Sequence, residues 1–147
     1  MIQKLRRRMA QDQSGFTLVE LLVVMLIIGL LAAIAIPSFF NQRDKAKDAT
    51  AKEAVRTAQT AIETYNTDNN GSYLNADTTK LKAIESTLNG ANALTVTPTA
   101  TGKGYSVTVT GKGTNNVFTI SRSDTGALTY TCTTVATGGC PSTGTWN

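Results

Sequence analysis

The pattern of hydrophobic positions begins with one long apolar run near the start of the chain. No side chain from Leu21 to Ile36 is charged or carries a hydrogen-bonding group. As a helix, the wider span Phe16–Phe40 would be about 37 Å long, which is enough to cross a bilayer. The run therefore predicts a membrane-spanning helix over residues 16–40.

After Phe40 the pattern changes to that of an amphipathic helix. Charged residues are spread among alanines, which favour helix. One apolar stripe recurs at spacings of three and four, and it comprises Ala51, Val55, Ala58, Ile62 and Tyr65. We therefore expect the helix to continue over residues 41–68 with one face packed on a sheet, and to end in the polar run Asn66–Gly71.

The rest of the chain, residues 69–147, predicts a small head with one short helix and an antiparallel sheet. Asp77 and Thr78 could cap a helix that ends at Asn89–Gly90, with Leu81, Ile84 and Leu88 on one face. Alternating apolar positions then predict three strands, through Tyr105, Val107 and Val109, through Phe118 and Ile120, and through Leu128, Tyr130 and Cys132. Short connections over Gly111–Asn115 and Ser123–Gly126 favour a meander, and Leu94–Thr97 is a candidate fourth strand. The predicted fold class is α+β.

The net charge of +4 belongs mainly to the first residues of the chain. Four of the 14 basic residues and one of the 10 acidic residues precede Gly15, which leaves 10 basic against 9 acidic residues from Phe16 onward. The basic residues of the predicted head are scattered, at Lys80, Lys82, Lys103, Lys112 and Arg122. Direct binding of nucleic acid would favour clustered basic and aromatic residues, so we do not expect it.

The candidate chemistry of the chain is sparse. There is no histidine, and we find no catalytic constellation, so the sequence predicts neither an enzyme nor a metal or other cofactor. The two cysteines, Cys132 and Cys140, suit one disulfide in an oxidising compartment, worth roughly 2.5 kcal/mol. The alternative is two unpaired thiols. The lone Trp146 either pins the tail to the head or lies exposed as a contact residue, and its large ring favours burial.

Two interpretations of the N-terminal segment compete. Ala33-Ile34-Ala35 offers a cleavage site for an ordinary secretory signal. Against this stands Glu20, because a carboxylate within a membrane-spanning segment is costly and points to a function. In either case the basic residues before the apolar run should stay in the cytoplasm, so the rest of the chain should lie on the far side of the membrane.

Residues around Gly15 carry a family resemblance. The basic leader, Ser14-Gly15 and then Phe16-Thr17-Leu18-Val19-Glu20-Leu21-Leu22-Val23-Val24 resemble the processing and methylation signature of type IV prepilins and pseudopilins. The resemblance is strongest over residues 1–40, and looser through Tyr65–Tyr73 and the cysteines. It implies the pilin fold, in which a helix spine packs on an antiparallel sheet and a C-terminal disulfide closes a surface loop.

The resemblance also implies that a membrane peptidase removes residues 1–15 by cutting between Gly15 and Phe16 and then N-methylates Phe16. The new α-amine would lie about 6 Å along the helix from Glu20. Because an unpaired charge is costly in an apolar filament core, we expect Glu20 to pair with the Phe16 amine of an adjacent subunit.

Gly29 and Pro37 both weaken the predicted helix. Proline removes a backbone donor and crowds the preceding turn, at roughly 3 kcal/mol, so we expect a kink or local melting. Either the interval between them unwinds when the subunit leaves the bilayer, or the bend is static.

The resemblance predicts a structural subunit of a type IV pilus. Its partners would be further copies of itself, the prepilin peptidase and the assembly machinery of the cytoplasmic membrane. It would be a single-pass membrane protein before assembly and part of an extracellular filament afterwards. The alternatives are a minor or competence pilin that binds DNA, and a type II secretion pseudopilin. Adhesion, twitching motility and DNA uptake stay open.

Overall fold

The computed structural model describes residues 15–147. Most of the predicted leader, residues 1–14, lies outside the described residues. The chain divides into two compact units, one ending at Phe39 and the other beginning at Phe40. One long helix, α2 (Leu18–Asp68), contributes to both.

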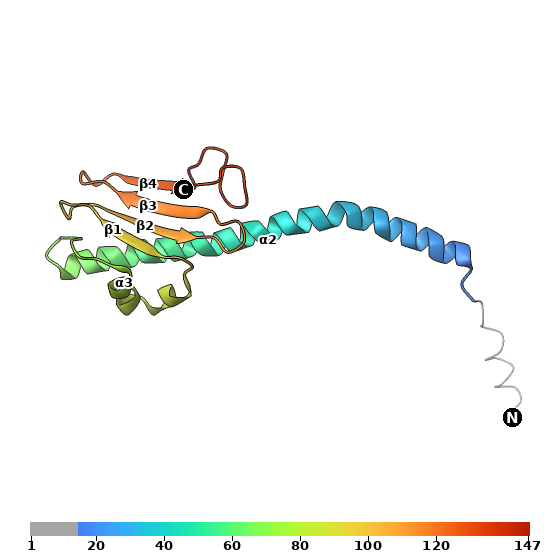
Figure 1. The fold of residues 1–147 in the computed structure, drawn as a ribbon, viewed down its shortest axis with the longest axis horizontal. Helices are drawn as coiled ribbons and strands as arrows, with labels where there is room; N and C mark the ends of the chain where they lie inside the picture. Colours follow the sequence, from blue (N-terminus) through green and yellow to red (C-terminus); the bar gives the residue numbers. More distant parts are fainter. Residues whose placement is uncertain (1–14) are drawn as a thin grey trace, which may run out of the picture. The chain divides into compact units, whose positions relative to one another are not determined.

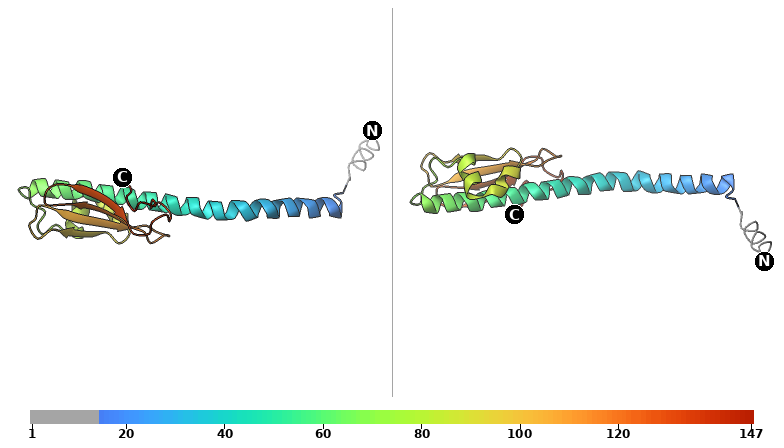
Figure 2. Two further views of the ribbon diagram at one scale, coloured as in Figure 1. Left: turned by 90° about the horizontal axis from the view of Figure 1, so that it is seen from above. Right: turned by 90° about the horizontal axis from the view of Figure 1, so that it is seen from below.

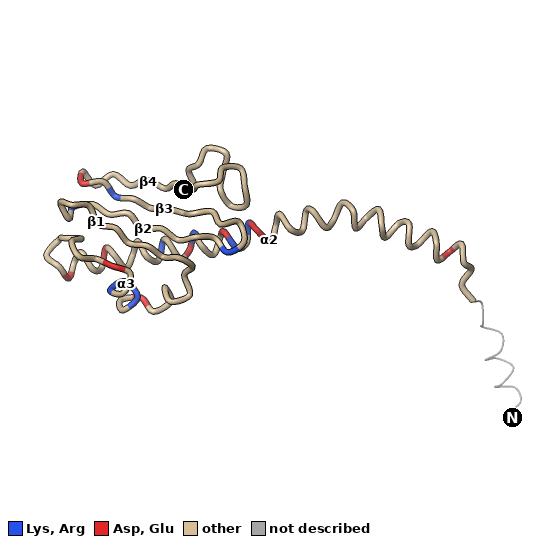
Figure 3. The backbone as a smooth tube through the Cα atoms, viewed as in Figure 1, with Lys and Arg blue, Asp and Glu red and all other residues tan. Residues whose placement is uncertain are grey.

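The first unit consists of the apolar part of α2. Its large apolar side chains are exposed, from Val23 at 48% to Phe16 at 83%. Among the described residues, α2 alone is long and apolar enough to cross a membrane. Glu20 is the one charged residue from Gly15 to Phe39, and Figure 3 shows a single red position in this part of α2. The sequence predicts a kink or local melting at Gly29 and Pro37, and the helix is continuous through both residues, so it is not melted there. Unwinding on leaving the bilayer stays a prediction.

The second unit is the head, in which the C-terminal part of α2 packs on the sheet (Figure 1). The predicted stripe is confirmed, because its members are all buried: Ala51, Val55, Ala58, Ile62 and Tyr65. The helix ends as a turn in which the Gly71 amide donates to the Asn66 carbonyl at 2.9 Å. Asn70 and Gly71 both have positive φ there, a conformation that asparagine and glycine tolerate best.

The predicted single short helix is wrong in one respect, because it is two elements. α3 (Thr78–Ile84) begins at Asp77, whose side chain accepts a hydrogen bond from the Lys80 amide at 2.8 Å. It ends at Glu85, which is extended and whose side chain caps the 3-10 helix η1 (Ser86–Gly90). Leu81 and Leu88 are buried, but Ile84 is 39% exposed, so it does not share their buried face as the sequence predicts.

The sheet is a four-stranded antiparallel meander in the order β1-β2-β3-β4. The strands are β1 (Thr95–Pro98), β2 (Tyr105–Thr110), β3 (Val117–Arg122) and β4 (Leu128–Cys132). The candidate fourth strand at Leu94–Thr97 thus exists, shifted by one residue. α3 and η1 lie at the β1 end of the sheet (Figures 1 and 2). The α+β fold is as predicted.

One face of this sheet completes the core. Val107 pairs with Ile120, and Phe118 with Cys132. The alternation predicted for β2 and β3 is confirmed, because every apolar position of those strands' predicted faces is buried: Tyr105, Val107, Val109, Phe118 and Ile120. β4 is less covered, with Leu128 at 40% exposed.

The C-terminal tail covers the outer edge of β4. Thr145 forms a bridge with Thr131, and the Trp146 indole N–H donates to the Thr131 carbonyl at 2.8 Å. The Trp146 ring is 5% exposed and makes edge contacts with Phe118 and Tyr130, at centroid distances of 5.8 and 5.5 Å. Burial of Trp146 is therefore confirmed, and pairing of the tail protects a sheet edge.

Candidate assembly site

The predicted processing junction lies in exposed, non-helical backbone directly before α2. Gly15, Phe16 and Thr17 are all exposed, and within residues 15–147 no other segment would contact a β-carbon placed at Gly15. A peptide bond in an irregular, uncovered segment is accessible to a peptidase. The geometry is compatible with cleavage between Gly15 and Phe16.

Glu20 is engaged within its own chain, in a capping box at the start of α2. Its Oε2 accepts hydrogen bonds from the Thr17 amide and the Thr17 hydroxyl, both at 2.8 Å. In return the Glu20 amide donates to Thr17 Oγ1 at 3.2 Å. Threonine followed three residues later by glutamate before an apolar run is the sequence signature of this cap, but the sequence interpretation assigned Glu20 to assembly alone.

The capping box changes the role expected of Glu20 before assembly. Two donors from Thr17 satisfy one carboxylate oxygen, and Glu20 Oε1 receives no hydrogen bond from the described residues. Negative charge in the first turn also favours the helix, because the helix dipole is positive there. The carboxylate is thus partly satisfied in the single chain and retains an acceptor for a further donor.

Comparison with known proteins identifies the segment that contains this site. Residues 11–36 match the family described as "Prokaryotic N-terminal methylation motif". The chain is also 35% identical to competence protein ComGC of Halalkalibacterium halodurans over 68 residues, which are 46% of this chain and 67% of that protein. The chain belongs to the type IV pilin-like family. Membership of this family implies filament self-assembly and processing by a prepilin peptidase.

Two other relatives are named for two different systems, type II secretion and the type IV pilus. It is 41% identical to type II secretion system core protein G of Pseudomonas aeruginosa over 59 residues, 40% of this chain and 42% of that protein. It is 45% identical to type IV major pilin protein PilA of Myxococcus xanthus over 51 residues, 35% of this chain and 23% of that protein. The matches thus span less than half the length of these two relatives. No solved structure is significantly similar to the chain.

The two cysteines of this pilin-like chain form a disulfide. Cys132 and Cys140 are bonded with their α-carbons 5.8 Å apart, so the alternative of two free thiols is wrong. Near this loop, Lys52 Nζ lies 5.4 Å from the centre of the Phe118 ring and 5.7 Å from that of Trp146. Partial burial lowers the pKa of Lys52, although the nearby charge of Asp48 opposes the effect.

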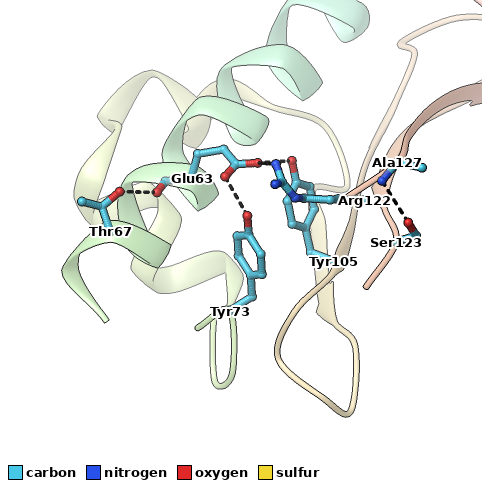
Figure 4. Close-up of polar contacts among 7 residues, drawn as sticks. All are labelled: Glu63, Thr67, Tyr73, Tyr105, Arg122, Ser123 and Ala127. Atoms are coloured by element: carbon cyan, nitrogen blue, oxygen red, sulfur yellow. Dashed lines mark hydrogen bonds and ion pairs between the residues drawn. The ribbon is translucent and has the colours of Figure 1, made fainter. Parts of the chain in front are cut away.

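A cluster of polar side chains around Glu63, near the C-terminal end of α2, was not predicted from the sequence. The Glu63 carboxylate accepts hydrogen bonds from the Tyr73 hydroxyl at 2.7 Å, the Tyr105 hydroxyl at 2.9 Å and Arg122 at 3.1 Å (Figure 4). Burial, reinforced by the bond to Glu63, raises the pKa of Tyr73 to about 12 and also raises that of Tyr105. Because Tyr105 and Arg122 belong to the sheet and Glu63 belongs to α2, these hydrogen bonds join the helix to the sheet.

Metal-binding chemistry is not assembled in the described part of the chain. Residues 15–147 contain no group of three or more histidine, cysteine, aspartate or glutamate side chains that could hold an ion. In the loop after α2, the Asn69 amide group donates to the Tyr65 carbonyl at 2.8 Å and so continues the helix end. The polar side chains of this loop therefore serve to end α2.

Proposed function

We propose that this chain is a structural subunit of a type IV pilus that polymerises through the N-terminal part of α2. The observation that carries the proposal is the exposed apolar surface of residues 16–40, which bears a single charge at Glu20. Such a surface is unstable in water. A bilayer would cover it before assembly, and neighbouring copies of the same helix would cover it in a filament.

Processing would create a positively charged partner for the Glu20 carboxylate, which the precursor does not have. Cleavage after Gly15 and N-methylation would leave a cationic amine on Phe16, next to the capping box. Glu20 Oε1 is available to that amine on an adjacent subunit while Oε2 stays bonded to Thr17. In an apolar filament core, a mismatch in register would leave both charges unpaired, so the pair would fix the register.

The proposed topology places the head outside the cytoplasm. Basic residues precede the apolar helix, which favours an N-in, C-out orientation. The Cys132–Cys140 disulfide supports this side, because disulfides persist in oxidising compartments. The subunit would be a single-pass protein of the cytoplasmic membrane and then part of a surface filament, and it would have no catalytic activity.

A type II secretion pseudopilin is the second candidate. Relatives of both kinds match the chain over fewer than half of its residues, so their names do not separate the two functions. The disulfide-closed C-terminal loop favours a pilus subunit, because the pilin fold that the sequence resembles has such a loop. Direct DNA binding is less favoured, because two of the scattered basic residues, Lys80 and Arg122, form ion pairs with Asp77 and Glu63.

Replacement of Glu20 tests the proposed function. In a strain that lacks the wild-type subunit, Glu20→Val should insert into the membrane but yield no sheared surface fibres by electron microscopy. Glu53→Val removes an exposed carboxylate from the head part of the same helix and should leave fibres intact. Normal fibres from Glu20→Val would refute the charge pairing. If the wild type forms no surface fibres and the Glu20→Val strain no longer releases secreted proteins into the medium, the secretion pseudopilin would be favoured.

A further inference from the structure

Asp48 is a fully buried carboxylate in the head, on the face of α2 that packs against the loops. It accepts hydrogen bonds from three groups. The Thr114 hydroxyl bonds to Oδ1, and the Asn116 side chain and the Gly139 amide bond to Oδ2 at 3.2 and 2.8 Å. None of these donors is a cation, and neither ion pair among the described residues involves Asp48. The hydrogen bonds to Asp48 therefore come from neutral donors alone, and its charge also interacts with that of the nearby Lys52.

The donors come from two segments that are distant in sequence. Thr114 and Asn116 belong to the connection between β2 and β3, whereas Gly139 belongs to the loop that the disulfide closes. Asn116 is itself fully buried and ties the two segments together. Its side chain donates to the Thr137 carbonyl at 2.9 Å and accepts from the Thr134 amide at 2.8 Å.

Glycines allow both segments to approach this carboxylate. A β-carbon at Gly111 or at Gly138 would overlap a carboxylate oxygen of Asp48. One at Gly139 would lie 2.8 Å from the Asp48 β-carbon, closer than real β-carbons approach. Three glycines from two segments thus surround one side chain, and the packing leaves no room for a larger residue at these positions.

We infer that Asp48 is a positioning residue that docks the C-terminal loop on α2 and thereby promotes the Cys132–Cys140 disulfide. The Gly139 amide that bonds to Asp48 immediately precedes Cys140, which is 3% exposed. Fixing this peptide restricts Cys140 to the neighbourhood of Cys132 even when the thiols are reduced. By linkage, the disulfide must then strengthen the docking by the same factor as the docking strengthens the disulfide. The inference does not depend on the filament function.

The redox step is the oxidation of two thiols by a small disulfide. A thiolate of Cys132 or Cys140 attacks glutathione disulfide and releases one glutathione, and the second cysteine then displaces the other. The protein loses two electrons and two protons, and the oxidant becomes two molecules of glutathione. Docking by Asp48 acts on the second displacement, because that displacement requires the two cysteines to meet.

Equilibration of the full chain in detergent micelles with reduced and oxidised glutathione tests the inference. We expect Asp48→Asn to lower the equilibrium constant for disulfide formation about tenfold, because a neutral amide is a weaker acceptor for three donors. Asp44→Asn, one turn earlier and not fully buried, is the matched control and should stay within about twofold of the wild type. An Asp48→Asn constant equal to that of Asp44→Asn would overturn the inference.

A second variant keeps the test decisive if Asp48→Asn unfolds the head. Thr114→Val removes one donor and retains the charge, and we expect it to lower the constant about threefold. Hydrogen exchange at the Gly139 amide should accelerate in both variants while the disulfide is intact, and Trp146 fluorescence reports whether the head stays folded. Unchanged exchange and an unchanged constant in folded Thr114→Val would also overturn the inference.

Discussion

Removal of the Glu63 carboxylate should destabilise the head strongly. In Glu63→Ala, the hydroxyls of Tyr73 and Tyr105 lose their acceptor while their side chains stay buried, at 3% and 1% exposed. Each buried donor left unpaired costs about 1–3 kcal/mol, and we take the lower half of that range because water can reach the opening left by a partly exposed Glu63. The ion pair with Arg122 adds at most about 1 kcal/mol, since both side chains are about one-third exposed.

The expected loss is therefore about 3 kcal/mol of unfolding free energy. Urea denaturation of the full chain in detergent micelles measures it, followed by the fluorescence of the single tryptophan, Trp146, which is buried in the head. Glu53→Ala, exposed on the same helix, should change the free energy by less than about 0.5 kcal/mol. A loss below about 1 kcal/mol in Glu63→Ala, or one equal to that of Glu53→Ala, would refute the reasoning.

Two further predictions concern the same head. Folding raises the pKa of Tyr73 from 10.0 to about 12, through burial first and the bond to Glu63 second, so this contribution to stability is complete below about pH 10 and is lost as the pH rises towards 12. Tyrosinate absorbance and urea midpoints at alkaline pH check this, and four tyrosines that all titrate with midpoints near pH 10 would contradict it. Trp146→Ala removes the contacts with Phe118 and Tyr130 and should cost about 3 kcal/mol in thermal unfolding followed by circular dichroism; a loss below about 1 kcal/mol would show that the tail is dispensable.

The elements that the sequence predicts well are those with a regular hydrophobic period. The buried stripe of α2 and the alternation in β2 and β3 follow directly from spacings of three to four and of two. The short helix was predicted less well, because a single residue, Glu85, leaves the helical conformation and starts η1. Period alone does not reveal such a local break.

The polar clusters could not be predicted, since their members are distant in sequence. Asp48 and Gly139 are 91 residues apart, and Glu63 and Arg122 are 59 apart. From the pattern alone, both carboxylates would be placed on the solvated face of the helix, but in the fold each accepts hydrogen bonds from these distant residues. The capping box at Thr17 and Glu20 was within reach of the sequence. Threonine followed three residues later by glutamate signals this local bond, independently of any role of Glu20 in assembly.

The mature N-terminus of the protein is the most direct test of the central claim, that this chain is a processed pilus subunit. Mass spectrometry of the protein recovered from sheared surface fibres should give a chain that begins at Phe16 and carries one methyl group on its amine. A soluble protein that begins at Ile36, with no fibres on the cell, would contradict the claim. That result would instead establish the apolar segment as an ordinary secretory signal.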